Sequence, residues 1–235
     1  MIFEKEAKRI RNSLISISNS TDPYQPLEKE LQITRKSLEI LIKNNVRIQI
    51  VTKSNLVERD IDIIKSGKVV VAFTITTLKS KISKKLEPYA PSPKQRIKTA
   101  KKLIENGIPV VVRYDPIIPS VNENEKKLIR KLAVIGVRQL ISSTLKIKPL
   151  IWQRLLIKFP SLEKKLGNLY FKEGEKIGSY WYLPRDLRIK ILENVKKIAE
   201  KYGMLFSTCR ENLSFLNSAP TCDGSWLTLK IKHKN

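Results

Sequence analysis

Cysteine, histidine and long apolar runs are all scarce in this sequence of 235 residues, which has two cysteines and one histidine. Two cysteines are too few for a disulfide framework, so the cytoplasm is the expected compartment. The single histidine, His233, lies in a basic tail and in practice excludes a Ser–His–Asp triad. No apolar run reaches about 18 residues, so we expect neither a transmembrane helix nor a membrane partner. The charged N-terminus lacks the pattern of a secretory signal.

Acidic residues are also scarce relative to basic ones. The chain has 46 Lys and Arg against 22 Asp and Glu, which gives a formal net charge of +24 and a pI near 10.0. Basic residues concentrate within 79–85 and 126–131. Such a field favours nucleic acid as a partner, although no zinc-finger or RNA-recognition motif occurs. The alternative, that these lysines form solvated faces in a sequence rich in Lys and Ile, stays open.

Apolar segments alternate with helical patterns over the first two thirds of the chain. Strands are expected over 13–19, 46–52, 68–76, 108–114 and 137–144, with helices between them. This alternation predicts βαβ units and a parallel sheet. Because such crossovers are right-handed, all the carboxyl ends of the strands should meet at one edge. The predicted fold class is therefore α/β, a partial parallel (β/α) barrel.

The pattern changes near residue 149, which predicts two domains, a barrel over 1–148 and a C-terminal extension over 149–235. The extension should contain short helices over 150–159 and 161–166 and an aromatic loop over 170–182. A long amphipathic helix, a final strand and a tail should follow. The aromatic side chains of the loop could stack on bases, but packing against the barrel mouth is the simpler reading.

Polar side chains follow each expected strand at its carboxyl end. They are Thr21 and Asp22, Lys53, Thr74, Arg113 and Asp115, and the run 142–144. Hydroxyls, carboxylates and cations at one edge suit a charged, polyhydroxylated ligand. The alternative is that the serines and threonines only begin loops and cap helices.

The segments that carry these residues resemble a known family. They read TDPYQPLE, VTKSNLVERDIDII, TITTLKSKISKKLEPYAPSPKQRI and DPIIPSVNEN, in that order. Together they are similar to the barrel of radical S-adenosylmethionine (SAM) proteins, above all the group related to spore photoproduct lyase. The similarity runs from about residue 5 to 145, and the tail CRENLSFLNSAPTCDGSW also resembles that group. The resemblance implies a radical-SAM-type barrel that binds S-adenosylmethionine.

The sequence departs from this family at the metal centre. In the family, three cysteines of a CxxxCxxC loop after the first barrel strand bind a [4Fe–4S] cluster, which cleaves SAM to a radical that abstracts hydrogen. This chain has neither that loop nor that first strand, and Cys209 and Cys222 lie elsewhere. We therefore expect no metal ligands and no activity from this chain alone. The missing strand should also leave an open barrel edge for a polypeptide partner.

The resemblance assigns SAM-binding roles to five residues. Lys53 matches the lysine that holds the SAM carboxylate, and Thr74 matches a serine that contacts SAM. Thr21 and Asp22 lie where the family's loop approaches the SAM amino group. Asp115 replaces a small residue beside the adenine, which puts that contact in doubt.

Three further residues, Tyr24, Gln25 and Arg113, are candidates for the substrate edge. Ser120 stands where related proteins usually have glycine, so a Cβ there should cost backbone freedom. The function predicted is that of a radical-SAM-type protein related to spore photoproduct lyase, acting on nucleic acid but truncated or inactive as it stands. The alternatives are a non-catalytic, basic barrel that binds nucleic acid, and a structural protein with no small ligand.

Overall fold

A six-stranded parallel sheet forms the centre of the computed structural model, which describes residues 2–17 and 21–229. His233 and the end of the basic tail lie outside these residues. The strands are β1 (Leu14–Ile17), β2 (Arg47–Thr52), β3 (Val69–Thr74), β4 (Val110–Ile117), β5 (Gln139–Thr144) and β8 (Leu205–Thr208), in the spatial order β1-β2-β3-β4-β5-β8. Every neighbouring pair is parallel. The predicted α/β class and partial barrel are confirmed.

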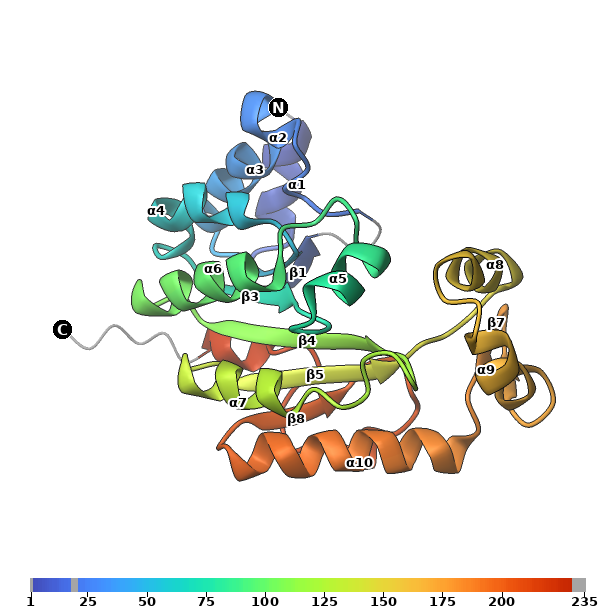
Figure 1. The fold of residues 1–235 in the computed structure, drawn as a ribbon. Helices are drawn as coiled ribbons and strands as arrows, with labels where there is room; N and C mark the ends of the chain where they lie inside the picture. Colours follow the sequence, from blue (N-terminus) through green and yellow to red (C-terminus); the bar gives the residue numbers. More distant parts are fainter. Residues whose placement is uncertain (1, 18–20, 230–235) are drawn as a thin grey trace.

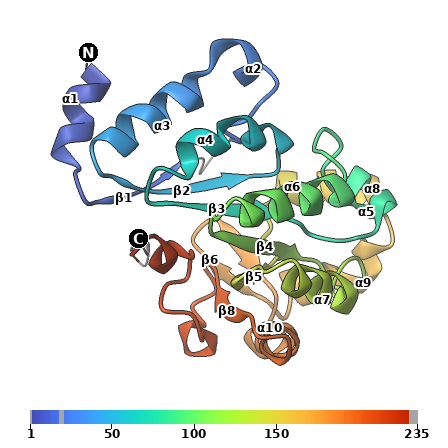
Figure 2. The ribbon, with the colours of Figure 1, turned by 90° about the vertical axis from the view of Figure 1, so that its left-hand side faces the viewer.

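Helices cover the convex side of this curved sheet (Figure 2). They are α1 (Ile2–Arg9), α2 (Glu28–Leu31), α3 (Ile33–Lys43), α4 (Ile61–Ile64), α6 (Pro93–Glu105), α7 (Lys126–Val134) and α10 (Arg185–Lys201), with a 3-10 helix over Asn55–Asp60. Alternate strand residues such as Ile50, Val71 and Phe73 pack against them in the main core. Because strand side chains alternate between faces, the intervening residues point into the concave side.

The C-terminal segment, residues 218–229, closes the concave side near the beginnings of the strands. Trp226 and Leu227 pack there against alternate residues of β3, β4 and β5. The Gln139 side chain of β5 donates to the Thr221 carbonyl at 2.9 Å and accepts from the Trp226 indole at 2.7 Å. Gln49 of β2 donates to the Asp223 carbonyl at 2.6 Å. The concave face is thus filled at one end, and space remains only toward the carboxyl ends of the strands.

Local signals in the sequence set most helix boundaries. Ser92 caps α6 in a capping box with Gln95, as its position predicts. The helix expected over 27–44 is divided into α2 and α3 at Gln32, whose φ is 52°. The helical segment after β2 is capped by the Ser54 side chain, not by the expected Asn55. Ser120 has a φ of 64°, so it does occupy a conformation that favours glycine.

A separate unit stands beyond the arrowheads of β4 and β5 (Figure 1). It consists of α8 (Pro149–Lys158), α9 (Leu162–Phe171) and an antiparallel hairpin of β6 (Glu175–Ile177) and β7 (Tyr180–Tyr182). The expected aromatic loop over 170–182 is therefore wrong, because this stretch ends a helix and forms the hairpin. Rings of Trp152, Phe171 and Trp181 pack edge to edge with centroids 5.6 Å apart, which favours the packing role.

The rest of the predicted extension returns to the sheet. The strand β8 pairs with β5, and α10 packs against β8, β5 and α7. Only about residues 149–182 stand apart from the barrel, and the division of the chain at 148 stays a prediction. In the part of the chain that the structure describes, no helix has the length and apolarity needed to cross a bilayer.

We expect Gly224→Ala to destabilise the protein more than Gly203→Ala does, by roughly 1–3 kcal/mol. Both glycines have positive φ, 83° and 78°, so both substitutions strain the backbone. Only at Gly224 would the new Cβ collide, at 2.6 Å from a Val111 methyl group, whereas nothing lies within 4 Å at Gly203. Urea unfolding followed by circular dichroism measures both. Equal losses would show that the C-terminal segment is not packed on β4.

Candidate functional site

Three hollows lie in a row along the carboxyl edge of the sheet. The first, of about 410 Å³, lies beyond β1 and β2, and we name it the Tyr24 hollow. The second, the α8 chamber, has about 640 Å³ and lies between α8 and α5 (Ser80–Leu86), and Lys53 lines both. The third, the hairpin hollow, has about 280 Å³ and shares Pro116 and Leu145 with the α8 chamber. This edge is where parallel α/β folds bind ligands.

Asp22 connects the loop after β1 to the end of β2. Its Oδ1 accepts hydrogen bonds from the Thr52 hydroxyl at 2.7 Å and the Tyr24 amide at 2.9 Å. Its Oδ2 accepts from the Lys53 amide at 2.7 Å. Asp22 therefore fixes the backbone from which the Lys53 side chain projects. Its contact with a SAM amino group stays a prediction, as does that of the exposed Thr21.

Lys53 stands at the centre of the row of hollows. Its Nζ lies 3.4 Å from Glu87 Oε1, and its side chain is 41% exposed. Glu87 makes a shorter ion pair, 2.6 Å, with the buried guanidinium of Arg96. Arg96 also donates to the Thr74 carbonyl at 3.0 Å, which brings the predicted residues Lys53 and Thr74 into one cluster. With one longer ion pair, Lys53 can still bind an anionic group.

Arg113 and Asp115 form an ion pair on the inner wall. The Arg113 guanidinium and the Ser143 hydroxyl donate to different oxygens of the Asp115 carboxylate. Arg113 also donates to Cys209 Sγ at 3.5 Å. Burial lowers the pKa of Arg113, but the adjacent Asp115 and Cys209 outweigh it and leave the pKa above its ordinary value. The predicted SAM residue Asp115 and substrate-edge residue Arg113 are therefore direct partners.

Tyr24 and Gln25 both line the Tyr24 hollow but differ in exposure. Tyr24 is 3% exposed, and its hydroxyl donates to Asp60 Oδ2 at 3.1 Å. Burial, with the Asp60 charge, raises the pKa of Tyr24, so the phenol stays protonated at neutral pH. Gln25 is exposed. The structure places both at the edge where sequence reasoning expected the substrate, with Tyr24 held as part of the wall.

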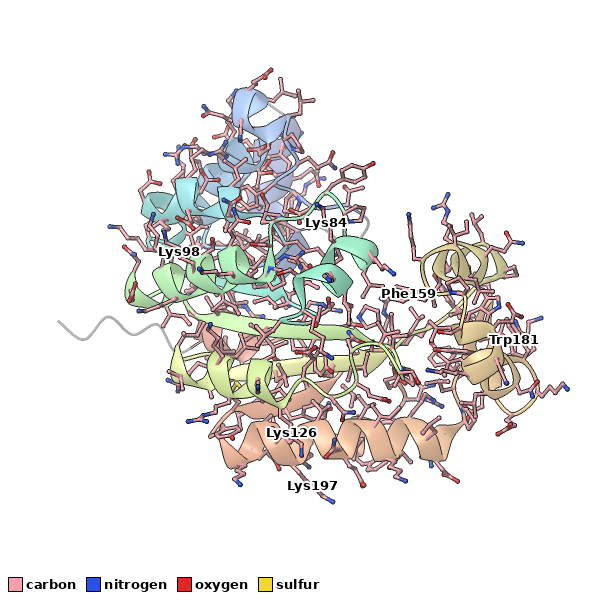
Figure 3. The ribbon with its side chains drawn as sticks, in the orientation of Figure 1. Lys84, Lys98, Lys126, Phe159, Trp181 and Lys197 are labelled. Atoms are coloured by element: carbon pink, nitrogen blue, oxygen red, sulfur yellow. The ribbon has the colours of Figure 1, made fainter. Side chains whose placement is uncertain are left out.

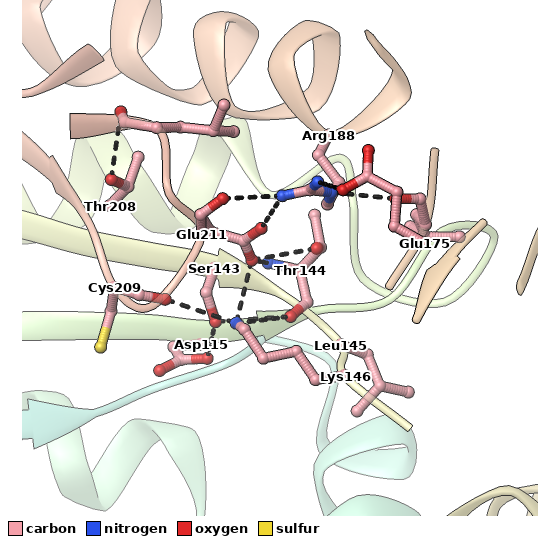
Figure 4. A network of polar contacts seen from close by, with 12 residues as sticks. Asp115, Ser143, Thr144, Leu145, Lys146, Glu175, Arg188, Thr208, Cys209 and Glu211 are labelled. Carbon is pink, nitrogen blue, oxygen red and sulfur yellow. Dashed lines mark hydrogen bonds and ion pairs between the residues drawn. The ribbon is translucent and has the colours of Figure 1, made fainter. Parts of the chain in front are cut away.

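A buried network around Glu211 was missed by sequence reasoning (Figure 4). Glu211 is 1% exposed, and its Oε1 accepts from the Thr144 amide at 2.8 Å and from Lys146 Nζ at 2.9 Å. Its Oε2 accepts from Arg188 of α10 at 3.0 Å, and Arg188 also pairs with Glu175 of the hairpin at 2.8 Å. The network thus holds the hairpin, α10 and the end of β5 together at the barrel mouth.

The residues present fit SAM better than they fit an iron–sulfur cluster. A cluster needs several thiolates, and the chain has only Cys209 and Cys222. Within residues 2–17 and 21–229, no group of three or more His, Cys, Asp or Glu side chains is placed to hold a metal ion. By contrast, Lys53 and the hydroxyl groups at the strand ends offer partners for a carboxylate and a ribose.

Comparisons with known proteins agree with this geometry. A sequence model of the Radical SAM superfamily matches residues 3–132. An uncharacterised protein of Acidianus two-tailed virus is 31% identical over 194 residues, which cover 74% of this chain and 64% of the relative. The radical SAM Nalpha-GlyT isomerase of Pseudomonas phage M6 is 23% identical over 220 residues, covering 90% and 45%. The chain therefore spans less than two thirds of the length of these relatives.

A similar fold occurs in a solved structure of a spore photoproduct lyase mutant with bound AdoMet and dinucleoside spore photoproduct. The TM-score is 0.65 at 17% sequence identity, and the match covers 86% of this chain and 62% of the lyase. At this identity the match speaks for the fold alone.

Glu211→Gln should lower the free energy of unfolding by about 3–5 kcal/mol, because it leaves the buried cations of Arg188 and Lys146 without their charge partner. A suitable control is Glu200→Gln, which removes an exposed i,i+4 pair with Lys196 at 3.9 Å and should cost less than about 1 kcal/mol. Urea unfolding measures both variants. A loss at Glu211 no larger than at Glu200 would contradict the role of the network.

Proposed function

The chain belongs to the Radical SAM superfamily, and on that premise we propose that it binds S-adenosylmethionine beside Lys53 and acts on nucleic acid at the barrel mouth. The observation that carries the proposal is the position of Lys53. Its half-exposed ammonium lies between the Tyr24 hollow and the α8 chamber, on a backbone fixed by Asp22. A cofactor held there would lie next to a substrate in the α8 chamber.

The side chains around Lys53 suit the parts of SAM. The ammonium would pair with the carboxylate of the methionine moiety, a charge-assisted contact. The hydroxyls of Thr21 and Thr74 and the carboxylate of Asp115 would serve the ribose and the amino group, as the family resemblance predicts. In the family, bound SAM supplies a hydrogen-abstracting radical, and that chemistry requires a cluster for which this chain has no ligand set. The chain's own residues therefore bind and orient.

Charge supports nucleic acid as the partner. The formal net charge is +24, and cations line all three hollows. They are Lys29 and Lys53 in the first, Lys85, Arg154 and Lys158 in the second, and Lys146 and Arg210 in the third. A phosphate backbone that passed along this row would meet a cation at each step. Lys98, Lys126 and Lys197 extend the positive charge over the helical layer (Figure 3).

A second candidate function is nucleic-acid binding without catalysis. It is favoured by the number of thiols, because two cysteines cannot replace the three cluster ligands of the family. A cluster-bearing polypeptide partner would restore catalysis. Among the described strands, β1 pairs only with β2, so its other edge could accept such a segment.

Lys53→Ala should weaken SAM binding by roughly tenfold or more, since hydrogen bonds to charged groups contribute about 1.5–3 kcal/mol. The control is Lys98→Ala, which removes an exposed lysine of α6 far from the hollows and should leave affinity unchanged. Isothermal titration calorimetry with SAM gives both affinities. Equal affinity of Lys53→Ala and the unsubstituted chain would remove Lys53 from the site.

Affinity for a short single-stranded oligonucleotide should fall steeply as salt rises. If the row of hollows contacts several phosphates, log K should decrease with log[salt] with a slope of about −0.7 per phosphate neutralised. Fluorescence anisotropy over a series of KCl concentrations measures this slope. A flat response, or no binding at low salt, would contradict nucleic acid as the partner.

A further inference from the structure

The α8 chamber is built from two parts of the chain. Thr76, Pro116 and Ile118 lie within the residues that the family model matches, 3–132. Leu145, Leu155 and Phe159 lie beyond that match and close the chamber from the side of α8. Its volume of about 640 Å³ is within the range of small-molecule sites. Because half of the wall comes from outside the matched region, the chamber is a feature of this chain's own extension.

One polar group in the wall of the chamber lacks a partner. The hydroxyl of Thr76 is buried and makes no hydrogen bond among the residues that the structure describes. Thr76 is 3% exposed, so bulk water does not replace the missing partner. An unsatisfied buried hydroxyl is unfavourable unless a bound group supplies the hydrogen bond. A purely aliphatic ligand would leave it unsatisfied, whereas a ligand with a polar edge would not.

The rim of the chamber is positive. Lys85, Arg154 and Lys158 are exposed there, and the carboxylate of Glu87 is already engaged by Arg96 and Lys53. The ligand should therefore carry negative charge. Lys85 Nζ lies 5.2 Å from the centroid of the Phe159 ring, so a cation and an aromatic ring adjoin at the opening.

The Phe159 ring faces the barrel across the gap between α8 and α5 (Figure 3). Every nucleobase has a flat face that stacks on an aromatic ring, and its edge carries hydrogen-bonding groups. Phosphates on either side of the base supply the negative charge that the rim attracts. A nucleotide therefore matches the apolar wall, the unsatisfied hydroxyl and the cations together.

We propose that the α8 chamber holds one nucleobase of a nucleic-acid strand, with the Thr76 hydroxyl at the polar edge of the base and Lys85, Arg154 and Lys158 at the adjoining phosphates. The inference rests on the proposed action on nucleic acid and names the site where a single base is recognised. Lys53 lines the chamber on the side of the proposed SAM site, so the base and the cofactor are neighbours.

The test compares two single-stranded oligonucleotides that differ only in one central residue, a thymidine or an abasic unit. Thr76→Val, which keeps the shape but removes the hydroxyl, should weaken binding of the thymidine oligonucleotide about tenfold and leave binding of the abasic one unchanged. Phe159→Ala should act in the same direction. Lys197→Gln, on the outer face of α10, removes an exposed charge outside the chamber and should affect both oligonucleotides equally.

The outcomes separate this inference from the proposed function. Salt-dependent binding that does not discriminate the two oligonucleotides, or that Thr76→Val and Phe159→Ala weaken equally for both, would overturn the base site and leave nucleic-acid binding intact. No binding of either oligonucleotide by the unsubstituted chain would overturn both. Circular dichroism of each variant checks that it is folded, and Thr76→Val keeps the test decisive if Phe159→Ala unfolds α8.

Discussion

The buried carboxylate of Glu211 joins three parts of the chain that are far apart in sequence. It binds Lys146 after β5 and Arg188 on α10, and through Arg188 it reaches Glu175 on the hairpin. A buried charge is strongly unfavourable without its partners, so these parts must dock together or not at all. Because the hairpin and the end of β5 form the walls of the hairpin hollow, the shape of the barrel mouth depends on this one contact.

The mouth is open because the opposite end of the barrel is filled. The C-terminal segment crosses the beginnings of the strands through its carbonyls at Thr221 and Asp223, which accept from Gln139 and Gln49. Polar side chains of the inner face are therefore satisfied at that end and remain available near the carboxyl ends. A ligand can enter from only one side, the side on which Lys53 and the cations of the hollows lie.

Periodicity predicted the sheet well, because each strand pairs with a neighbour and alternates buried side chains. Lys53 could be predicted as a site residue because a lysine directly after an apolar strand is unusual. The pairing of Glu211 with Arg188 could not, since nothing local marks residues that meet only through folding. Asp22 looked like a ligand contact, yet both its oxygens bind the chain itself. The hairpin was missed because its strands are three residues long.

The distribution of charge connects the fold to the proposed partner. The carboxylates at the mouth are buried or nearly so and spend their charge on neighbours: Glu87 on Arg96, Asp115 on Arg113, and Glu211 on Arg188 and Lys146. Each arginine of these pairs is also buried, so the pairs contribute little to the field outside. What solvent and ligands meet is mainly the lysines, which stand on the rim and over the helical layer. The effective surface is thus positive where the hollows open, and a polyanion is the ligand that such a surface attracts.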